Sequence, residues 1–154
     1  MPFPTLLTPR LLLRQLAETD DAAIFSLRSD DRVNRYLDRH KPNSMEEASA
    51  FINKINDAIT DNKSFYWAIT LKDEPGLIGT ICLWNLSEDR KTAELGYELQ
   101  TDQLGKGYMN EAMKAVIDYS FEAAGFSTLE AYTHKDNEAS TKLLLKHRFV
   151  LQAD

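Results

Sequence analysis

Hydrophobic residues recur at helical spacing in two long segments of the chain. In residues 44–59 they lie three or four positions apart, and Ser44 with Glu47 has the spacing of a capping box at a helix start. The same period marks one face of residues 109–121, and Gly125 follows where a helix can end. Both segments are therefore predicted to be amphipathic helices.

Two further helices are predicted from their capping residues. One runs from residue 19 to about residue 37, with Thr19 as its N-cap and a break near Ser29. The other covers residues 136–147, and Asp136 is expected to cap it.

Strands are predicted where β-branched and aromatic residues gather between turn signals. The predicted strands are residues 10–16, 64–71, 77–84, 92–99, 127–133 and 148–152. Residues 77–84 are apolar on both faces, which indicates a central strand. Pro75 and Gly76 predict a type II turn, and short turns join the middle three strands into an antiparallel meander.

The predicted order is β-α-α-β-β-β-α-β-α-β, which indicates an α+β (mixed α/β) fold with a mostly antiparallel central sheet covered by helices. The chain has 154 residues, and we expect residues 1–154 to form a single domain. The last strand is expected to be cut short, because the sequence stops at Asp154.

Composition narrows the class of protein. The chain is 43% hydrophobic and 27% charged, with a net charge of −6. The negative charge argues against nucleic-acid binding, which needs a basic surface. No apolar run approaches the roughly 20 residues of a membrane span. A single cysteine, Cys82, excludes an internal disulfide and a cysteine-rich zinc site. We expect a cytoplasmic protein that binds neither nucleic acid nor a membrane.

The segment from Gln103 to Tyr108 joins a predicted strand to a predicted helix and contains two glycines. It lacks the Lys-Ser/Thr of a P-loop and the third glycine of a dinucleotide-binding turn. The amides of a helix N-terminus favour an anion, and Gly105 and Gly107 would let it approach the backbone. A tight turn that requires positive φ is the other interpretation of this segment.

Three motifs in order resemble one family. They are "TPRLLLRQLAETDDA", "TAELGYELQTDQLGKGYMNEAMKAVIDYSF" and "DNEASTKLLLKHRF", and together they cover nearly the whole chain. They are similar to the GNAT acetyltransferase superfamily, and within it to the branch of the ribosomal-protein N-terminal alanine acetyltransferases. Asp102 stands where the acyl-CoA loop of that family has Gln or Arg. Arg148 stands where relatives usually have Gly, so the last helix is expected to end differently.

The resemblance implies acetyl-CoA as co-substrate and helices on both faces of the sheet. It implies that the backbone of Leu99, Gln100 and Thr101 pairs with the pantetheine amides by strand addition. The pyrophosphate would bind to the loop formed by Gln103, Leu104, Gly105, Lys106, Gly107 and Tyr108. A strand bulge around Tyr97–Leu99 would direct an amide at the thioester carbonyl.

Two carboxylates share one face of the third predicted meander strand. Alternation places Glu94 and Glu98 on the same face, with Gly96 between them. Because an amine must lose a proton to attack a thioester, a carboxylate here can act as a base, directly or through water. The resemblance favours Glu94 for this role, and a carboxylate paired with an Arg or Lys is the competing interpretation.

A second pair of candidates begins the last predicted helix. Asn137 and Ser140 lie three residues apart and therefore on one helix face. The resemblance assigns a cofactor contact to Asn137 and the stabilisation or protonation of the CoA thiolate to Ser140. Local capping of the helix is the alternative for both residues.

The remaining conspicuous residues have ordinary interpretations. Cys82 is expected in the core, and Tyr66, Trp67 and Trp84 are expected in the core or in a cleft wall. Tyr97 is open to either position. The three histidines (40, 134 and 147) lack metal-ligand spacing, so no metal is expected, and His134 is a weak acid–base candidate.

The resemblance therefore implies an N-acetyltransferase that acts on a primary amine, either a protein N-terminus or a small amine, by direct attack in a ternary complex. The alternative is a non-catalytic acyl-CoA-binding regulatory module on the same fold. An incomplete last strand leaves a sheet edge exposed, and from this we predict a homodimer.

Overall fold

The computed structural model describes residues 3–152. The strands are β1 (Leu6–Leu7), β2 (Leu11–Arg14), β3 (Phe65–Leu71), β4 (Leu77–Trp84), β5 (Thr92–Leu99) and β6 (Thr128–Glu130). The helices are α1 (Asp21–Ser29), α2 (Met45–Thr60), α3 (Tyr108–Glu122) and α4 (Glu138–Lys146), with 3-10 turns η1 (Glu18–Asp20) and η2 (Thr101–Gln103). The fold is mixed α/β, as predicted.

The six strands form one sheet in the order β1-β2-β3-β4-β5-β6. Neighbours from β1 to β5 are antiparallel, and β5 pairs with β6 in parallel. The meander of β3, β4 and β5 is confirmed, and β4 is its central strand with nearly every side chain buried. Parallel pairing of β5 with β6 requires a crossover connection, which α3 provides.

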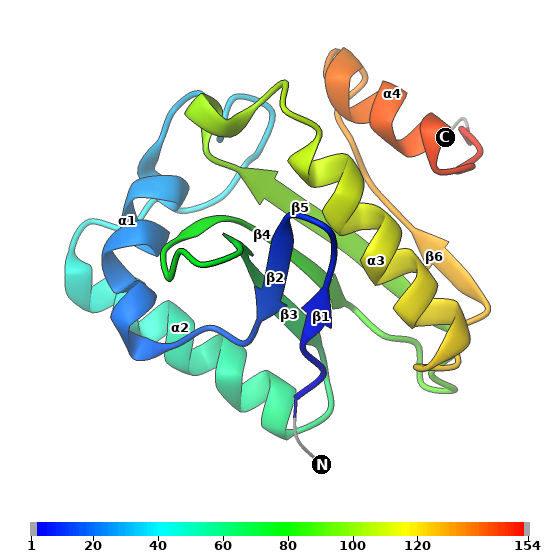
Figure 1. Cartoon of the computed structure of the whole chain (residues 1–154), viewed down its shortest axis with the longest axis horizontal. Helices are drawn as coiled ribbons and strands as arrows, with labels where there is room; N and C mark the ends of the chain where they lie inside the picture. Colours follow the sequence, from blue (N-terminus) through cyan, green and yellow to red (C-terminus); the bar gives the residue numbers. More distant parts are fainter. Residues whose placement is uncertain (1–2, 153–154) are drawn as a thin grey trace.

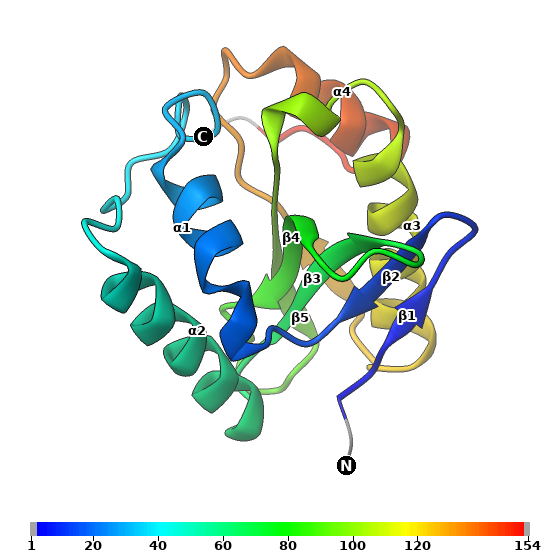
Figure 2. The ribbon, with the colours of Figure 1, turned by 60° about the vertical axis from the view of Figure 1, so that its left-hand side comes forward.

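Helices cover both faces of the sheet (Figures 1 and 2). On one face α3 packs its buried residues Met109, Ala112, Met113 and Val116 against the strands, and Leu144 of α4 joins the same core. On the other face Ile24 and Leu27 of α1 pack with Ile52 of α2 over a smaller core. The sheet therefore separates two hydrophobic cores, and its edges and strand ends are left for polar chemistry.

The N-terminal third of the chain differs in detail from the prediction. The strand predicted at residues 10–16 is limited to β2, and β1 precedes it as an unpredicted partner. The helix predicted from residue 19 ends at Ser29, so the expected break terminates it. Thr19 lies inside η1 and does not cap α1. In contrast, the Ser44 cap of α2 is confirmed, since its hydroxyl accepts a 3.2 Å bond from the amide of Glu47.

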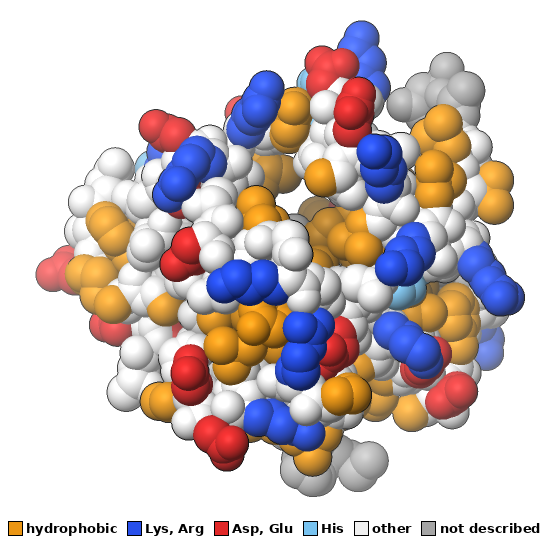
Figure 3. All heavy atoms as spheres, turned by 45° about the horizontal axis from the view of Figure 1, so that its top comes forward, with side chains coloured by type: hydrophobic (Ala, Val, Ile, Leu, Met, Phe, Trp, Pro, Cys, Tyr) orange, Lys and Arg blue, Asp and Glu red, His pale blue; other side chains and the backbone are white. Residues whose placement is uncertain are grey.

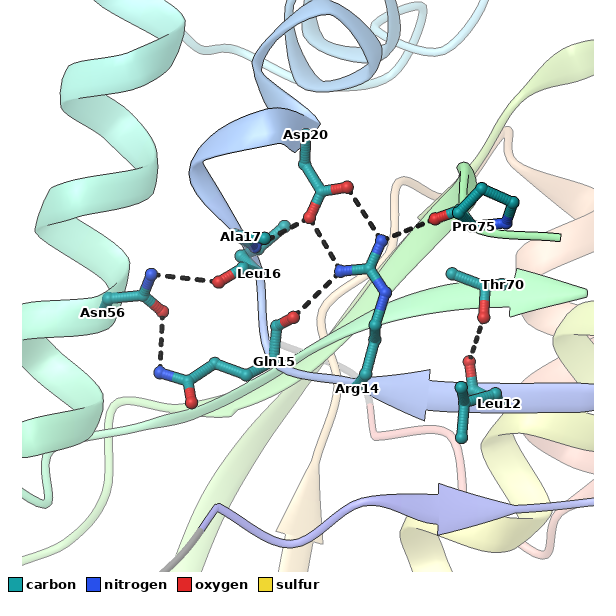
Figure 4. A network of polar contacts seen from close by, with 9 residues as sticks. All are labelled: Leu12, Arg14, Gln15, Leu16, Ala17, Asp20, Asn56, Thr70 and Pro75. Carbon is teal, nitrogen blue, oxygen red and sulfur yellow. Dashed lines mark hydrogen bonds and ion pairs between the residues drawn. The ribbon is translucent and has the colours of Figure 1, made fainter.

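A buried ion pair ties β2 to the start of α1 (Figure 4). Nη1 and Nη2 of Arg14 each donate to one carboxylate oxygen of Asp20 at 2.8 Å. Asp20, whose side chain is 5% exposed, also accepts from the amide of Ala17 at 2.8 Å. Nη2 of Arg14 reaches the carbonyl of Pro75 at 2.7 Å, so one guanidinium connects β2, η1 and the β3–β4 turn.

The β3–β4 turn has a different geometry from the predicted one. Type II geometry requires positive φ at Gly76, but the residue with positive φ is Asp73, at 69°. The amide of Glu74 donates to the carbonyl of Leu71 at 3.1 Å, which closes the turn three residues earlier. The type II turn at Pro75 and Gly76 was therefore a wrong prediction.

The C-terminal part also departs from the pattern. The strand predicted at residues 127–133 forms only at Thr128–Glu130, and within the described residues no strand follows α4. The side-chain cap of α4 is Asn137 rather than Asp136. After α4, the amides of Arg148 and Phe149 bond back to the carbonyls of Leu145 and Leu144, each at 3.0 Å, in a Schellman motif. Arg148 adopts φ of 69°, the conformation that glycine favours at this position.

Candidate active site

The last part of β5 has a neighbouring strand on one side only. β6 pairs with Thr92, Ala93 and Glu94 and then ends, whereas β4 stays paired with β5 as far as Leu99. The edge of β5 from Leu95 to Leu99 is consequently unpaired on the side where β6 diverges. An extended ligand with amide groups can add to such an edge as a strand would.

The bulge predicted around Tyr97–Leu99 is absent. β4 and β5 keep an even register from the Gly79–Leu99 pair to the Trp84–Glu94 pair. The register shift in this part of the sheet lies instead between Ile69 and Thr70 of β3. The bulge that the family resemblance implied is therefore not a feature of this strand pair.

The glycine loop after β5 forms an exposed turn into α3. The amide of Gln100 continues the sheet through a 2.8 Å bond to the carbonyl of Ile78, and η2 follows at Thr101. Gly105 and Gly107 adopt φ of 78° and 82°, and Gly107 is the N-cap residue of α3. A Cβ on Gly105 would meet nothing within 4 Å, so space outside this turn is open. Positive φ and an open helix N-terminus occur together here, which suits an anion.

Arg10, which comes from the N-terminal part of the chain, contacts this loop. Its Nη1 donates to the carbonyl of Lys106 at 2.8 Å, and its guanidinium lies 4.6 Å from the ring centre of Tyr108. A Cβ on Gly107 would lie 3.2 Å from Nη2 of Arg10, so this glycine also makes room for the arginine. Arg10 is a functional candidate that sequence reasoning missed, although it lies within the first motif of the resemblance.

Glu111 in the first turn of α3 orients Arg10. Its carboxylate accepts from Nε of Arg10 at 2.8 Å, from the Arg10 amide at 2.9 Å, and from the hydroxyl of Thr8. Burial acts to raise the pKa of Glu111, but the hydrogen bonds from Thr8 and Arg10 outweigh it and hold the pKa below its ordinary value. The positive charge of Arg10 thus compensates the negative charge of Glu111. Without this compensation, Glu111 would repel an anion bound at the N-terminus of α3.

The structure brings Ser140 together with Tyr97. The two hydroxyl oxygens lie 2.5 Å apart and join α4 to the unpaired part of β5. Burial raises the pKa of Tyr97, and the hydrogen bond with Ser140 opposes this only in part, so the phenol stays protonated at neutral pH. Tyr97 was left open between core and cleft wall by the sequence, and the structure makes it a candidate partner of Ser140.

Asn137 caps the helix that carries Ser140. The side-chain Oδ1 of Asn137 accepts from the backbone amide of Ser140 at 3.2 Å. The backbone amide of Asn137 donates to the carbonyl of His134 at 2.9 Å. The capping interpretation of Asn137 is therefore present in the structure. Cap formation uses Oδ1 and does not engage the amide nitrogen, Nδ2, so the predicted cofactor contact stays a prediction.

The two carboxylates of β5 lie on the opposite face from Tyr97, as alternation predicts. Oε1 of Glu94 accepts from Nδ2 of Asn85 at 3.4 Å, near the end of β5 that β6 covers. Glu98 pairs with Arg39, with 2.5 Å between Oε2 and Nη1. Glu98 is therefore a carboxylate paired with an arginine. In the described part of the chain, Glu94 does not contact Ser140.

The other singled-out side chains are structural. Burial, aided by Glu98, raises the pKa of the Cys82 thiol to about 12, so it is not a nucleophile at neutral pH. Trp67 is fully buried and donates from Nε1 to the carbonyl of Pro4 at 2.8 Å. Tyr66 is buried, whereas Trp84 is 47% exposed at the end of β4.

The histidines lie apart from one another, each with its own neighbour. His40 contacts Glu47 at 3.0 Å, His134 accepts from the amide of Asp136 at 3.1 Å, and His147 contacts Asn110 at 2.8 Å. Residues 3–152 contain no cluster of metal-ligating side chains. Over the same residues, no helix has the length and apolar character of a membrane span.

One face of the molecule is hollowed. Figure 3 shows a depression near the centre of this face, with hydrophobic side chains inside it and Lys and Arg side chains around it. A positively charged rim with an apolar interior suits a ligand that has phosphates at one end and an apolar arm at the other.

Residues 10–150 match the family model described as Acetyltransferase (GNAT) domain. The chain belongs to the GNAT acetyltransferase family. It is an acyl-CoA-dependent N-acetyltransferase, as the resemblance implied. The chain is also 37% identical over 147 residues to the uncharacterized N-acetyltransferase YoaA of Bacillus subtilis (strain 168). The aligned region covers 96% of this chain and 83% of that protein.

Solved structures share the fold of this GNAT chain. A ribosomal L7/L12 alpha-N-protein acetyltransferase in complex with coenzyme A superposes with a TM-score of 0.86 at 18% identity, over 97% of this chain and 86% of that one. The microcin C7 self-immunity acetyltransferase MccE, in complex with acetyl-CoA and AMP, gives a TM-score of 0.81 at 19% identity, over 94% and 81% of the two chains. These similarities establish the shared fold.

Proposed function

We propose that this GNAT protein transfers the acetyl group of acetyl-CoA to a primary amine by direct attack in a ternary complex. One observation carries the proposal: β5 loses its β6 partner after Glu94, and the unpaired stretch leads into the glycine loop and contacts Ser140. An unpaired strand edge, an anion-binding helix N-terminus and a hydroxyl pair therefore follow one another along the site.

The donor fits this sequence of groups. The pantetheine would lie along the open edge of β5 as far as Leu99 and reach the backbone of Gln100 and Thr101, where η2 begins. The pyrophosphate would bind to the loop from Gln103 to Tyr108. The open space at Gly105 supports this fit, because phosphate oxygens can reach the backbone there. The acetyl-CoA complex of the structural neighbour MccE is consistent with the same donor.

Residues of this chain would supply the remaining steps. Backbone amides on the open edge of β5 would stabilise the oxyanion. The Ser140 hydroxyl, supported by the protonated Tyr97, would donate to the leaving thiolate, since a thiolate is a poor leaving group until its charge is stabilised. Glu94 would take the proton of the amine through water, because Glu94 faces the other side of β5 from Ser140.

The acceptor is proposed to be a protein N-terminus or a small amine. One neighbour with this fold is a ribosomal L7/L12 alpha-N-protein acetyltransferase, which favours the first. Enzyme activity on each amine would be read as thiol release from acetyl-CoA, using peptides with small N-terminal residues beside free amines.

The test separates donor binding from catalysis. We expect acetyl-CoA to bind with the same Kd in wild type, Ser140→Ala and Glu94→Gln, while kcat falls by about 10²-fold or more in each variant. Exposed residues of the same type provide the matched controls Ser127→Ala and Glu88→Gln, which should keep wild-type kcat. Thiol release that is unchanged in both site variants would contradict the assigned roles. Binding of acetyl-CoA without turnover of any amine would favour a non-catalytic module.

A further inference from the structure

A second polar centre lies on the face of β5 opposite Ser140. Arg39, between α1 and α2, approaches Glu98 of β5 with 2.5 Å between Nη1 and Oε2. Nε of Arg39 donates to Oδ1 of Asn34 at 2.8 Å, and Nδ2 of Asn34 donates to the carbonyl of Arg28 at 2.7 Å. The guanidinium is therefore held in place by the end of α1 as well as by the sheet.

This ion pair is only half satisfied. Arginine and carboxylate groups commonly form two parallel hydrogen bonds, but here a single contact joins them. Nη2 of Arg39 and Oε1 of Glu98 are buried and have no hydrogen-bond partner among residues 3–152. Within those residues, the hydroxyls of Ser29 and Ser64 are the other buried side-chain polar atoms without a partner. Two unpartnered charged atoms in one pair are unusual, because burial without a partner is unfavourable.

The position of the pair relates it to the donor site. Tyr97 and Glu98 are consecutive on β5, so their side chains leave the strand on opposite faces. Tyr97 contacts Ser140 on the α4 side, and Glu98 contacts Arg39 on the α1–α2 side. A thioester placed along the open edge at this level would have the hydroxyl pair on one side and the Arg39–Glu98 pair on the other.

The surrounding charge limits the kind of molecule that can bind. Arg28 lies over the ring of Phe51 at 3.9 Å, and burial, together with Arg39, lowers the pKa of its guanidinium. Arg28, Arg39 and Glu98 carry two positive charges and one negative charge. Such a group disfavours an acceptor with several ammonium groups.

We propose that the Arg39–Glu98 pair binds the acceptor and selects a primary amine with a hydrogen-bond-accepting oxygen on a neighbouring carbon. Oε1 of Glu98 accepts from the amine, and Nη2 of Arg39 donates to that oxygen. This inference rests on the proposed function and narrows its acceptor class. The Arg39 side chain is 18% exposed and the Glu98 side chain 10%, but their two unpartnered atoms are buried. The acceptor therefore reaches these atoms only when a neighbouring side chain moves aside.

Two amines of similar size test the selection in the wild-type protein. L-alaninamide has an oxygen on the carbon next to the amine-bearing carbon. In sec-butylamine that neighbouring carbon carries a methyl group instead. Because L-alaninamide is the weaker base, rates are compared per concentration of unprotonated amine. On that scale we expect kcat/KM for thiol release to be at least tenfold higher with L-alaninamide, and spermidine to be as poor as sec-butylamine. Equal kcat/KM for the two matched amines overturns the inference while leaving the proposed function intact.

Variants assign the selection to the two residues. Arg39→Lys keeps the charge but loses the planar fork, and we expect it to reduce the preference for L-alaninamide at least tenfold. Glu98→Gln should raise KM for both amines, with the Kd of acetyl-CoA within twofold of wild type. An Arg39→Lys protein that retains the full preference contradicts the assignment.

A binding measurement without the donor keeps the two proposals distinguishable. L-alaninamide should raise the Tm of the wild-type protein more than sec-butylamine at equal concentration, and Arg39→Lys should remove the difference. No difference in wild type counts against the acceptor site whether or not acetyl-CoA binds. Failure of acetyl-CoA to bind counts against the proposed function alone.

Discussion

Replacement of Gly105 by alanine tests whether the glycine loop binds the donor. Gly105 has φ of 78°, and a Cβ there would meet nothing within 4 Å. The substitution therefore introduces backbone strain without a steric clash. An L-residue in the left-handed region costs roughly 1–2 kcal/mol.

The strain is distributed between stability and affinity. If the loop keeps its conformation, the free energy of unfolding falls by about 1–2 kcal/mol. If the free loop relaxes instead, the same energy opposes donor binding, and acetyl-CoA affinity falls by about 5- to 30-fold. Lost stability and lost binding energy should thus sum to about 1–2 kcal/mol, unless the new methyl group also excludes a phosphate, which adds to the loss of affinity.

Gly107→Ala should have the larger effect of the two. Its φ is 82°, and its Cβ would lie 3.2 Å from Nη2 of Arg10, so the clamp on the loop must also shift. Gly76→Ala is the matched control, because Gly76 lacks positive φ and has open space around its Cβ. That control should be neutral or slightly stabilising.

Urea unfolding and calorimetric titration with acetyl-CoA measure the two quantities, and initial rates give KM for both substrates. We expect KM for acetyl-CoA to rise in both loop variants while KM for the amine stays constant. Wild-type acetyl-CoA affinity and wild-type stability in Gly105→Ala would refute the reasoning, since neither the strain nor the donor site would then lie at this loop.

Two further substitutions test the framework. Arg148→Gly should raise the free energy of unfolding by about 0.5–1 kcal/mol, because relief of the left-handed strain exceeds the added entropy of an unfolded glycine; thermal unfolding should show a Tm about 1–4 °C higher, and an unchanged or lower Tm would contradict this. Asp20→Ala should lower the free energy of unfolding in urea by about 3–5 kcal/mol, because it leaves the largely buried Arg14 without its ion pair. Asp57→Ala, at an exposed helix position, is its control and should change stability by less than about 0.5 kcal/mol; equal effects of the two would show that the Asp20 pair is not a stabilising contact.

Local chemistry explains why much of the fold was readable in the sequence. The period of apolar residues located α2 and α3, and runs of β-branched and aromatic residues located the meander strands. The Ser44 cap formed where its spacing predicted. The errors fall where local preference competes with distant contacts. Thr19 is a good N-cap residue, but Asp20 is recruited by Arg14, and the chain forms η1 there instead.

The candidate site divides in the same way. The glycine loop and the alternation of β5 are local features, and the sequence determined both the helix N-terminus and the faces of Tyr97 and Glu98. Partner choice depended on the tertiary structure. Residue 10 meets residue 111, residue 97 meets residue 140, and residue 39 meets residue 98. Each of these contacts spans more than 40 positions, so no periodicity or spacing along the chain encodes it; it forms only when the sheet and its two helical layers fix both ends in space.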